Sequence, residues 1–468
     1  MTLKKASVVT VAALAIGIAF PYINLAIDNV YQQLRVITDV MEIIRENYVE
    51  EVKPQKLAYG AARGMVAELD DFSQFMEPDL YDRVKSDTEG EFGGIGIRID
   101  VREKWLTIVT PLPDTPAYRA GLYPGDKIIK IEGESTRDML IDEAVKKLRG
   151  KPGTKVNITI AREPEDKNSD WTELEVPLVR EIIMNESVKQ RVLEDKFGYI
   201  KILDFNGHTV EDFGKALKGL KKKGIEGLVL DLRYNPGGLL NAAVDVSKMF
   251  IGSRKMIVFT KGRKPENYQE FHADEKAEYS DLPLIVLINR YSASASEIVA
   301  GAVQDNKRGI VLGERSFGKA SVQSMIPLSD KSALRLTIAK YYTPSGRSIQ
   351  RADSRLSEKD KDKTEKDAEL KDKEKEEDAH LGGILPDIEV KVPLEEEKKL
   401  LKQSEELLYP DEKKEKKGKD KKADKDKKKS SSDSGFKPEE GEEVVRDQIL
   451  DRAVELLKAR EALAVIGG

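Results

Sequence analysis

Residues 225–240 read IEGLVLDLRYNPGGLL, and this stretch decides the fold. A run of apolar residues ends in charged residues and a Pro-Gly-Gly turn, which is typical of a strand buried on both faces of a sheet. Similar apolar runs return in LPLIVLIN at 282–289 and in GIVLGE at 309–314. Helical stretches separate these strands. The alternation predicts an α/β core with mainly parallel central strands over residues 181–350.

Residues 91–180 change to short alternating strands and glycine turns, which predicts a small β-rich module placed before the core. Its longer helix, IDEAVKKLRG, ends at Gly150, which we expect to be the C-cap. Its first strand opens with five residues that can form a binding loop: Gly93, Gly94, Ile95, Gly96 and Ile97. Successive N–H groups there can converge on an anion such as a peptide carboxylate, although a bare glycine turn has the same sequence.

The remaining segments differ in composition. We expect a helical region at 29–90, a strand returning to the core at 382–394, a short helical segment at 395–410 and a C-terminal helix within 439–468. Residues 351–381 and 411–438 are dominated by charged and small polar residues and hold almost no apolar ones. Neither can bury enough surface to offset the entropy of ordering, so we expect both to be disordered.

The N-terminal stretch, residues 1–28, carries Lys4 and Lys5 followed by an apolar run of about 20 residues, long enough to span a bilayer. No clean cleavage site precedes Asp28, so a removed signal peptide and an uncleaved membrane anchor both remain open, beside a buried helix. The basic flank would stay in the cytoplasm. We therefore expect an exported protein on the periplasmic or extracytoplasmic side of a membrane.

Composition excludes several classes of function. Acidic residues number 84 against 79 basic ones, for a net charge of −5, so nucleic acid is not an expected partner. The chain has no cysteine, which excludes disulfides, thiolate metal sites and a cysteine nucleophile. Three histidines leave little room for a multi-histidine metal site. We expect no metal or cofactor.

A candidate nucleophile lies in NRYSASASEIVAGA, residues 289–302, where a buried strand runs into a helix through Ser292, Ser294 and Ser296. A serine in such a turn suits nucleophilic attack, because N–H groups at the helix N-terminus can stabilise an oxyanion. Serine is also a common helix N-cap, which is the simpler explanation. The Pro-Gly-Gly turn likewise exposes N–H groups at a strand's C-terminal end, where α/β folds place ligands.

The stretch GERSFGKASVQ, residues 313–323, nearly spells a phosphate-binding loop. Ala320, however, replaces the hydroxyl that would hold Mg²⁺, and a strand-like pattern follows where a helix belongs. Lys319 is better explained as a general base, because burial can lower the pKa of a lysine and keep it neutral. A solvated surface lysine is the alternative. His208, His272 and His380 offer no obvious base.

These stretches together resemble the C-terminal processing, or tail-specific, serine peptidases, and residues 91–180 resemble a PDZ domain. LDDFSQFM, the PDZ-like run, DLRYNPGGLL, SASASEIVAGAVQD, GERSFGKASVQ, YYTPSGRSIQ and ILPDIEV occur in the family's order. Two departures are Ala320, where the family usually has glycine, and the charged insertion at 351–381. The resemblance implies an α/β peptidase core with an inserted PDZ domain.

The resemblance also implies roles for individual residues. Ser294 would be the nucleophile, Lys319 the base, and Gln323 the residue that orients Lys319. Gly237, or Gly238 in its place, and Ala295 would donate oxyanion N–H groups.

The expected protein is thus a serine endopeptidase whose PDZ domain binds free C-termini of protein substrates. A homodimer and an activating or adaptor protein are further expected partners, and a non-catalytic PDZ scaffold is the alternative function. Arg149 ends the PDZ helix. It is either a cation favoured by the helix dipole or a regulatory residue that pairs with an acidic group of the core when the PDZ domain is occupied.

Overall fold

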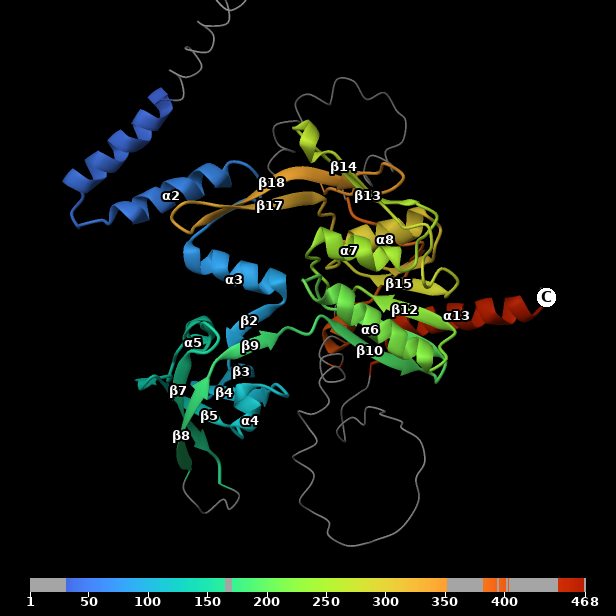
Figure 1. Ribbon diagram of the computed structural model, residues 1–468, viewed down its shortest axis with the longest axis horizontal. Helices are drawn as coiled ribbons and strands as arrows, with labels where there is room; N and C mark the ends of the chain where they lie inside the picture. Colours follow the sequence, from blue (N-terminus) through green and yellow to red (C-terminus); the bar gives the residue numbers. More distant parts are fainter. Residues whose placement is uncertain are drawn as a thin grey trace, which may run out of the picture. The chain divides into compact units, whose positions relative to one another are not determined.

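The computed structural model forms two compact units (Figure 1). The first contains the chain up to Tyr81 together with 323–337, and the second contains 82–322 and the chain from 338 onward. The structure describes residues 31–164, 171–351, 382–393, 395–400, 403 and 445–466. The expected signal or anchor at 1–28 and nearly all of both charged segments lie outside these residues. Within the described ranges, no helix is long and apolar enough to cross a membrane.

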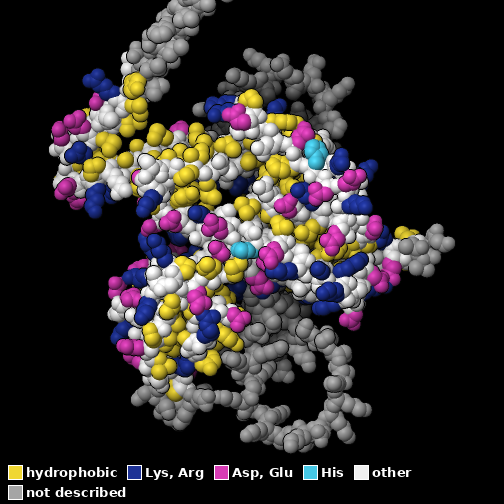
Figure 2. All heavy atoms as spheres, viewed as in Figure 1, with side chains coloured by type: hydrophobic (Ala, Val, Ile, Leu, Met, Phe, Trp, Pro, Cys, Tyr) yellow, Lys and Arg dark blue, Asp and Glu magenta, His cyan; other side chains and the backbone are white. Residues whose placement is uncertain are grey.

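The first unit holds a helix over 31–47, helix α2 (Pro54–Ala67), strand β1 (Gln74–Met76) and the ends of β17 (Ser321–Pro327) and β18 (Ala333–Tyr342). β1 pairs antiparallel with β18, from Gln74 opposite Arg335 to Met76 opposite Ala333. The expectation of helices throughout 29–90 is therefore wrong at β1. The strand forms because it pairs with a segment some 260 residues away, which local sequence does not show. Apolar side chains remain exposed on the N-terminal helices (Figure 2).

The β-rich module spans the chain from β2 to β9. Its elements are β2 (Glu91–Gly94), β3 (Ile97–Arg102), β4 (Trp105–Pro111), α4 (Pro116–Arg119), β5 (Lys127–Ile131), β6 (Glu134–Ser135), α5 (Ile141–Leu148), β7 (Lys155–Arg162), β8 (Thr172–Val179) and β9 (Glu181–Met184). The main sheet has the order β3-β4-β5-β7-β8, so β3 is an edge strand, and β2 pairs separately with β9. Buried isoleucines from β4, β5 and β7 form the core.

Helix α5 ends differently from the sequence expectation. It stops at Leu148, and Arg149 has an extended backbone with φ −71° and ψ 161°. Gly150 does not adopt the left-handed conformation of a glycine cap, so that prediction is wrong. The Arg180 guanidinium instead donates hydrogen bonds to Lys147 O at 2.8 Å and to Leu148 O at 3.0 Å. A distant arginine thus satisfies the carbonyls that a local glycine turn would have satisfied.

The peptidase-like core follows helix α3 (Pro78–Glu89) and the β-rich module. Its elements are β10 (Val188–Leu193), β11 (Phe197–Ile202), α6 (Thr209–Lys222), β12 (Gly227–Asp231), α7 (Leu240–Lys248), β13 (Met256–Gly262), η1 (Pro265–Asn267), β14 (Gln269–His272), β15 (Leu284–Ile288), α8 (Ala295–Asp305), β16 (Ile310–Gly313), β17, β18, β19 (Ile388–Glu389) and α13 (Gln448–Ile466). The central sheet has the order β10-β11-β12-β15-β16-β19. Every pairing in it is parallel except β10 with β11, which confirms the expected α/β core.

The central sheet is covered on both faces (Figure 1). Helices α6, α7 and α8 pack on one face around Phe213, Ala243 and Val299. Helix α13 packs on the other through Ile449, Ala453 and Leu457, with further apolar residues of the predicted C-terminal helix. β19 pairs parallel with β16, so the chain returns to the sheet after the charged insertion, as expected from the sequence.

A buried ion cluster fastens the start of α13 to the sheet. Asp231, at the end of β12, accepts hydrogen bonds from Tyr199 Oη at 2.7 Å and from Arg233 at 2.7–3.1 Å. Arg233 also donates to both carboxylate oxygens of Asp447, at 2.9 and 2.8 Å. Burial opposes ionisation of Asp231, but the charges of Arg233 and Lys201 outweigh it and lower the pKa of Asp231. Arg233 therefore neutralises two carboxylates at once.

Removing Arg233 should loosen this attachment. Arg233→Met leaves the buried Asp231 and the partly buried Asp447 without their shared partner, so we expect the free energy of unfolding to fall by about 3–5 kcal/mol in urea denaturation. The matched control is Arg452→Met on α13, whose ion pair with Glu455 at 3.0 Å is exposed. It should cost less than about 0.5 kcal/mol. Equal losses in both variants would contradict the structural role of Arg233.

Candidate active site

The three serines between β15 and α8 have different surroundings. Ser292 is fully buried, and its hydroxyl donates to Leu232 O at 2.8 Å. Ser296 is also fully buried, and its hydroxyl donates to Asn235 O at 3.0 Å. Ser294 is partly exposed and directly precedes α8. The structure thus commits two hydroxyls to the fold and leaves that of Ser294 accessible for chemistry.

The backbone at Ser294 is strained. Its φ of 54° and ψ of −113° lie in a region that residues with a side chain rarely adopt. Such a conformation costs about 1–3 kcal/mol and persists only where its surroundings impose it. A sharp strand-to-helix turn of this kind is how α/β hydrolytic folds expose a nucleophilic serine.

The Pro-Gly-Gly turn after β12 lies against Ser294, as the sequence led us to expect. A Cβ on Gly237 would lie 2.7 Å from Ser294 Cβ and 2.8 Å from Ala295 N, so only glycine fits. The Gly237 N–H, however, donates to Asn235 Oδ1 at 2.8 Å and is therefore occupied. Gly238 is exposed, and no described residue accepts its N–H. This favours Gly238, the alternative raised from the sequence, over Gly237 as an oxyanion donor.

Glu297 is a central residue that the sequence analysis missed. Its side chain is fully buried on α8. One carboxylate oxygen accepts from Ser316 Oγ at 2.6 Å and Gly318 N at 2.7 Å. The other accepts from Ser294 N at 2.8 Å and Lys319 N at 2.9 Å. One side chain therefore holds the backbones of both predicted catalytic residues.

Tyr341 makes a second link between the same two residues. Its buried hydroxyl lies 2.6 Å from Lys319 O and 2.9 Å from Ser294 O. Lys319 itself is partly buried. Ala320, which departs from the family's glycine, does not have a positive φ, so alanine fits there without strain. Ser294 and Lys319 are thus brought together by shared hydrogen-bond partners on both sides.

Gln323 and the histidines are placed elsewhere. Gln323 belongs to the first compact unit, where its Nε2 donates to Phe72 O at 2.6 Å. His208 Nε2 lies 3.7 Å from Glu91 Oε2, and His272 Nε2 lies 3.8 Å from Glu270 Oε2. His380 lies outside the described residues. In the described part of the chain, no group of acidic or histidine side chains could hold a metal ion.

The predicted peptide-binding loop joins β2 to the edge strand β3. Gly93 and Gly94 pair with β9, and Ile95 to Ile97 make the connection. Gly96 has a φ of 75°, and a Cβ there would lie 2.3 Å from Thr115 Cβ, so this position requires glycine. The loop conformation is therefore fixed by sterics rather than left free.

Arg149 contacts helix α3. Its Nη1 lies 3.5 Å from Asp87 Oδ1, and its guanidinium carbon lies 4.1 Å from the centre of the Phe92 ring. Its acidic partner therefore belongs to the connection before the β-rich module, and not to the peptidase-like core.

The carboxyl group of Glu297 should make stability depend on pH. Burial raises the pKa of Glu297 to about 7 from an ordinary 4.5, against the lowering effect of its hydrogen bonds. The folded chain thus holds a proton between these values that the unfolded chain has released. The stabilisation is complete below pH 4.5 and is lost as the pH rises through about 7.

Glu297→Gln should remove this dependence. Relative to Glu297→Gln, the free energy of unfolding of the unsubstituted chain should fall by about 3 kcal/mol between pH 4.5 and about pH 7 and stay level above that. Denaturant unfolding at several pH values measures it. Glu173→Gln, at an exposed position of β8, is the control and should leave the profile unchanged. A profile of Glu297→Gln parallel to that of the unsubstituted chain would contradict the assignment.

Three family models match the chain. Peptidase family S41 matches residues 196–355, a PDZ domain model matches 107–162, and the N-terminal domain of the activating protease CtpB matches 23–79. These regions contain Ser294 and Lys319, part of the β-rich module, and the N-terminal helices, respectively.

Curated relatives agree with these models. A carboxy-terminal-processing protease of Bartonella bacilliformis is 43% identical over 69% of this chain and 74% of its own. A carboxyl-terminal-processing protease of Synechocystis is 35% identical over 66% of this chain and 72% of its own. The carboxy-terminal processing protease CtpB of Bacillus subtilis is 37% identical over 67% of this chain and 65% of its own. The chain therefore belongs to the carboxy-terminal-processing proteases of peptidase family S41, which are serine-type peptidases.

Proposed function

We propose that the chain is an endopeptidase that uses Ser294 as nucleophile and Lys319 as general base. The observation that carries the proposal is the Glu297 carboxylate, which holds the backbone N–H groups of both residues at 2.8 and 2.9 Å. The exposed, strained Ser294 and the links through Tyr341 support the same pairing. Neutral Lys319 takes the proton from Ser294 Oγ, which attacks the substrate carbonyl.

The oxyanion that forms would accept hydrogen bonds from Ala295 N–H, at the start of α8, and from Gly238 N–H. Lys319 then returns the proton to the leaving amine, and water hydrolyses the acyl-enzyme in the second half of the reaction. Gln323 would orient Lys319 in the working enzyme through its Oε1, which the hydrogen bond from its Nε2 to Phe72 O does not occupy.

We further propose that the PDZ domain delivers substrates by their free C-termini. β3 is an edge strand with unpaired backbone groups, and α5 contributes to the same domain core, so an extended peptide can add as a strand along β3. The rigid loop ending in Gly96 and Ile97 would bind the terminal carboxylate. The core would then cleave close to that end.

The setting of the reaction is also a proposal. The basic and apolar residues 1–28 support export, with the body of the protein on the extracytoplasmic face, either anchored or released. Exposed apolar residues on the N-terminal helices, among them Tyr31, Leu34 and Ile43, support a homodimer. An activating or adaptor protein remains a candidate partner.

Activity should depend on the dyad and not on histidine. Against an unstructured protein with an apolar C-terminus, Ser294→Ala and Lys319→Ala should each lower kcat by at least about 10³-fold without unfolding the chain. The matched control His208→Ala should stay within a few-fold. The rate of the unsubstituted enzyme should rise with pH as Lys319 loses its proton. Equal inactivation by His208→Ala would refute the Ser–Lys mechanism, and no cleavage by the unsubstituted chain would favour a non-catalytic scaffold.

Arg149 tests whether the PDZ domain regulates the site. Under the regulatory hypothesis, Arg149 leaves Asp87 and pairs with an acidic residue of the core when a peptide binds the PDZ domain. Arg149→Ala should then lower turnover at least about tenfold, equivalent to 1.4 kcal/mol, while peptide affinity stays unchanged. Affinity is measured in the full chain carrying Ser294→Ala. The control is Arg119→Ala, another arginine of the domain with an exposed partner, Glu181. Equal loss in both assays, or in neither, would leave Arg149 as a helix-end cation.

A further inference from the structure

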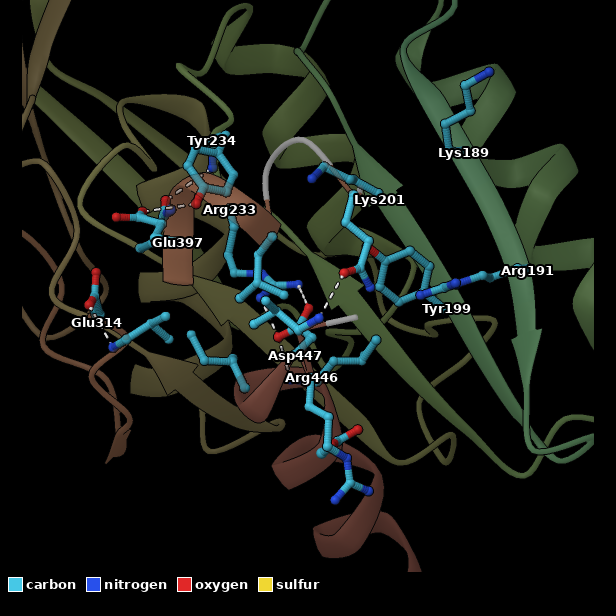
Figure 3. Close-up of a pocket in the computed structure, with 18 of the residues that line it drawn as sticks. Lys189, Arg191, Tyr199, Lys201, Arg233, Tyr234, Glu314, Glu397, Arg446 and Asp447 are labelled. Atoms are coloured by element: carbon cyan, nitrogen blue, oxygen red, sulfur yellow. Dashed lines mark hydrogen bonds and ion pairs between the residues drawn. The ribbon is translucent and has the colours of Figure 1, made fainter. Parts of the chain in front are cut away.

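A cavity lies on the α13 side of the central sheet. It has a volume of about 530 Å³ and opens between β10, β11, the residues after β12 and the start of α13 (Figure 3). Its walls include the aromatic rings of Tyr199 and Tyr234 and the aliphatic side chains of Val392, Leu400, Ile449 and Leu450. The serines and α8 belong to the opposite layer of the core, so this cavity is distinct from the proposed catalytic site.

Lys201 is the unusual residue of this cavity. It lies on β11, is 6% exposed and reaches toward Tyr234 (Figure 3). No described residue lies within hydrogen-bonding or ion-pairing distance of its Nζ. The nearest acidic residue in strand register is Asp231, whose two oxygens already accept from Tyr199 and Arg233. The ammonium group of Lys201 thus faces the cavity without an acceptor among the described residues.

Most other charges around the cavity are paired. Arg233 is shared between Asp231 and Asp447, and Arg446 lies 3.6 Å from Asp451.

The other charged groups beside the cavity, apart from Arg191, are also paired. Lys189 pairs with Glu186, and the carboxylates of Glu314 and Glu397 face Arg290. Arg191 has no acidic partner in the described part of the chain, and its guanidinium carbon lies 4.8 Å from the centre of the Tyr199 ring. Two cations, Lys201 and Arg191, therefore border the cavity without a counter-charge.

The contacts that Lys201 makes within the protein do not offset the cost of removing water from its ammonium group. Its Nζ lies 5.5 Å from the centre of the Tyr234 ring, and such a cation–π contact is weak. Removing water from an ammonium group costs more than this contact contributes. Burial accordingly lowers the pKa of Lys201, against the opposing charge of Asp231. An anion bound in the cavity would offset that cost.

We propose that this cavity binds a small organic anion, with its acidic group against Lys201 and its apolar part against Tyr199, Tyr234 and the aliphatic wall. Arg191 would contribute a second positive charge from the exposed middle of β10. The volume is that of a site for a small molecule rather than for a bare inorganic ion. A fully hydrated phosphate ion would make no favourable contact with the aliphatic side chains of the wall.

The test uses the full chain and isothermal titration calorimetry. Benzoate should bind with a Kd of about 1 mM or tighter, and benzamide, which has the same shape without the charge, at least about tenfold more weakly. Inorganic phosphate should bind more weakly than benzoate. Lys201→Met should weaken benzoate binding at least about tenfold. Lys215→Met, at an exposed position of α6 on the opposite face of the sheet, should leave it unchanged.

Several outcomes would overturn the proposal. These are no saturable binding of benzoate, equal binding of benzoate and benzamide, preference for phosphate over benzoate, or unchanged binding in Lys201→Met. The comparison of benzoate with benzamide needs no substitution, so it decides the question even if Lys201→Met does not fold.

Discussion

The carboxylate of Glu297 makes the interaction on which the proposed catalytic arrangement depends. It joins the turn before α8 to the GERSFGK segment, two stretches that local sequence does not bring together. A buried carboxylate is costly to desolvate, and four hydrogen-bond donors are needed to offset that cost. Because three of these donors are backbone N–H groups, the geometry is imposed on the main chain and does not rely on flexible side chains.

The seven residues from Asp231, the last residue of β12, to Gly237 serve both faces of the sheet. Asp231 and Arg233 point to the α13 side and fasten the C-terminal helix. Asn235 and Gly237 face the other side, where Asn235 O accepts from Ser296 and Gly237 closes against Ser294. A turn at 233–234 separates the two pairs, so one short segment both fastens the C-terminal helix and contacts Ser294.

The sequence was sufficient for the features that local patterns specify. Apolar runs separated by helices predicted the mainly parallel core, which the structure confirms, whereas the roles of Ser294 and Lys319 stay predictions. The errors arose where a distant partner decides the outcome. Arg180 caps α5 in place of Gly150, and β1 forms only because β18 is present. Glu297 was missed although Ser-x-x-Glu at 294–297 is a capping-box pattern, because the pattern does not reveal its contacts with Gly318 and Lys319.

The backbone of Ser294 restricts which hydroxyl can occupy the turn. Serine and threonine carry the same functional group, so either hydroxyl could in principle act as the nucleophile. At φ 54° a β-branched side chain meets its own backbone, whereas serine carries a single small substituent on Cβ. Replacement of serine by threonine is easy at most surface positions. At this position the main-chain geometry excludes it, whatever the reactivity of the hydroxyl oxygen.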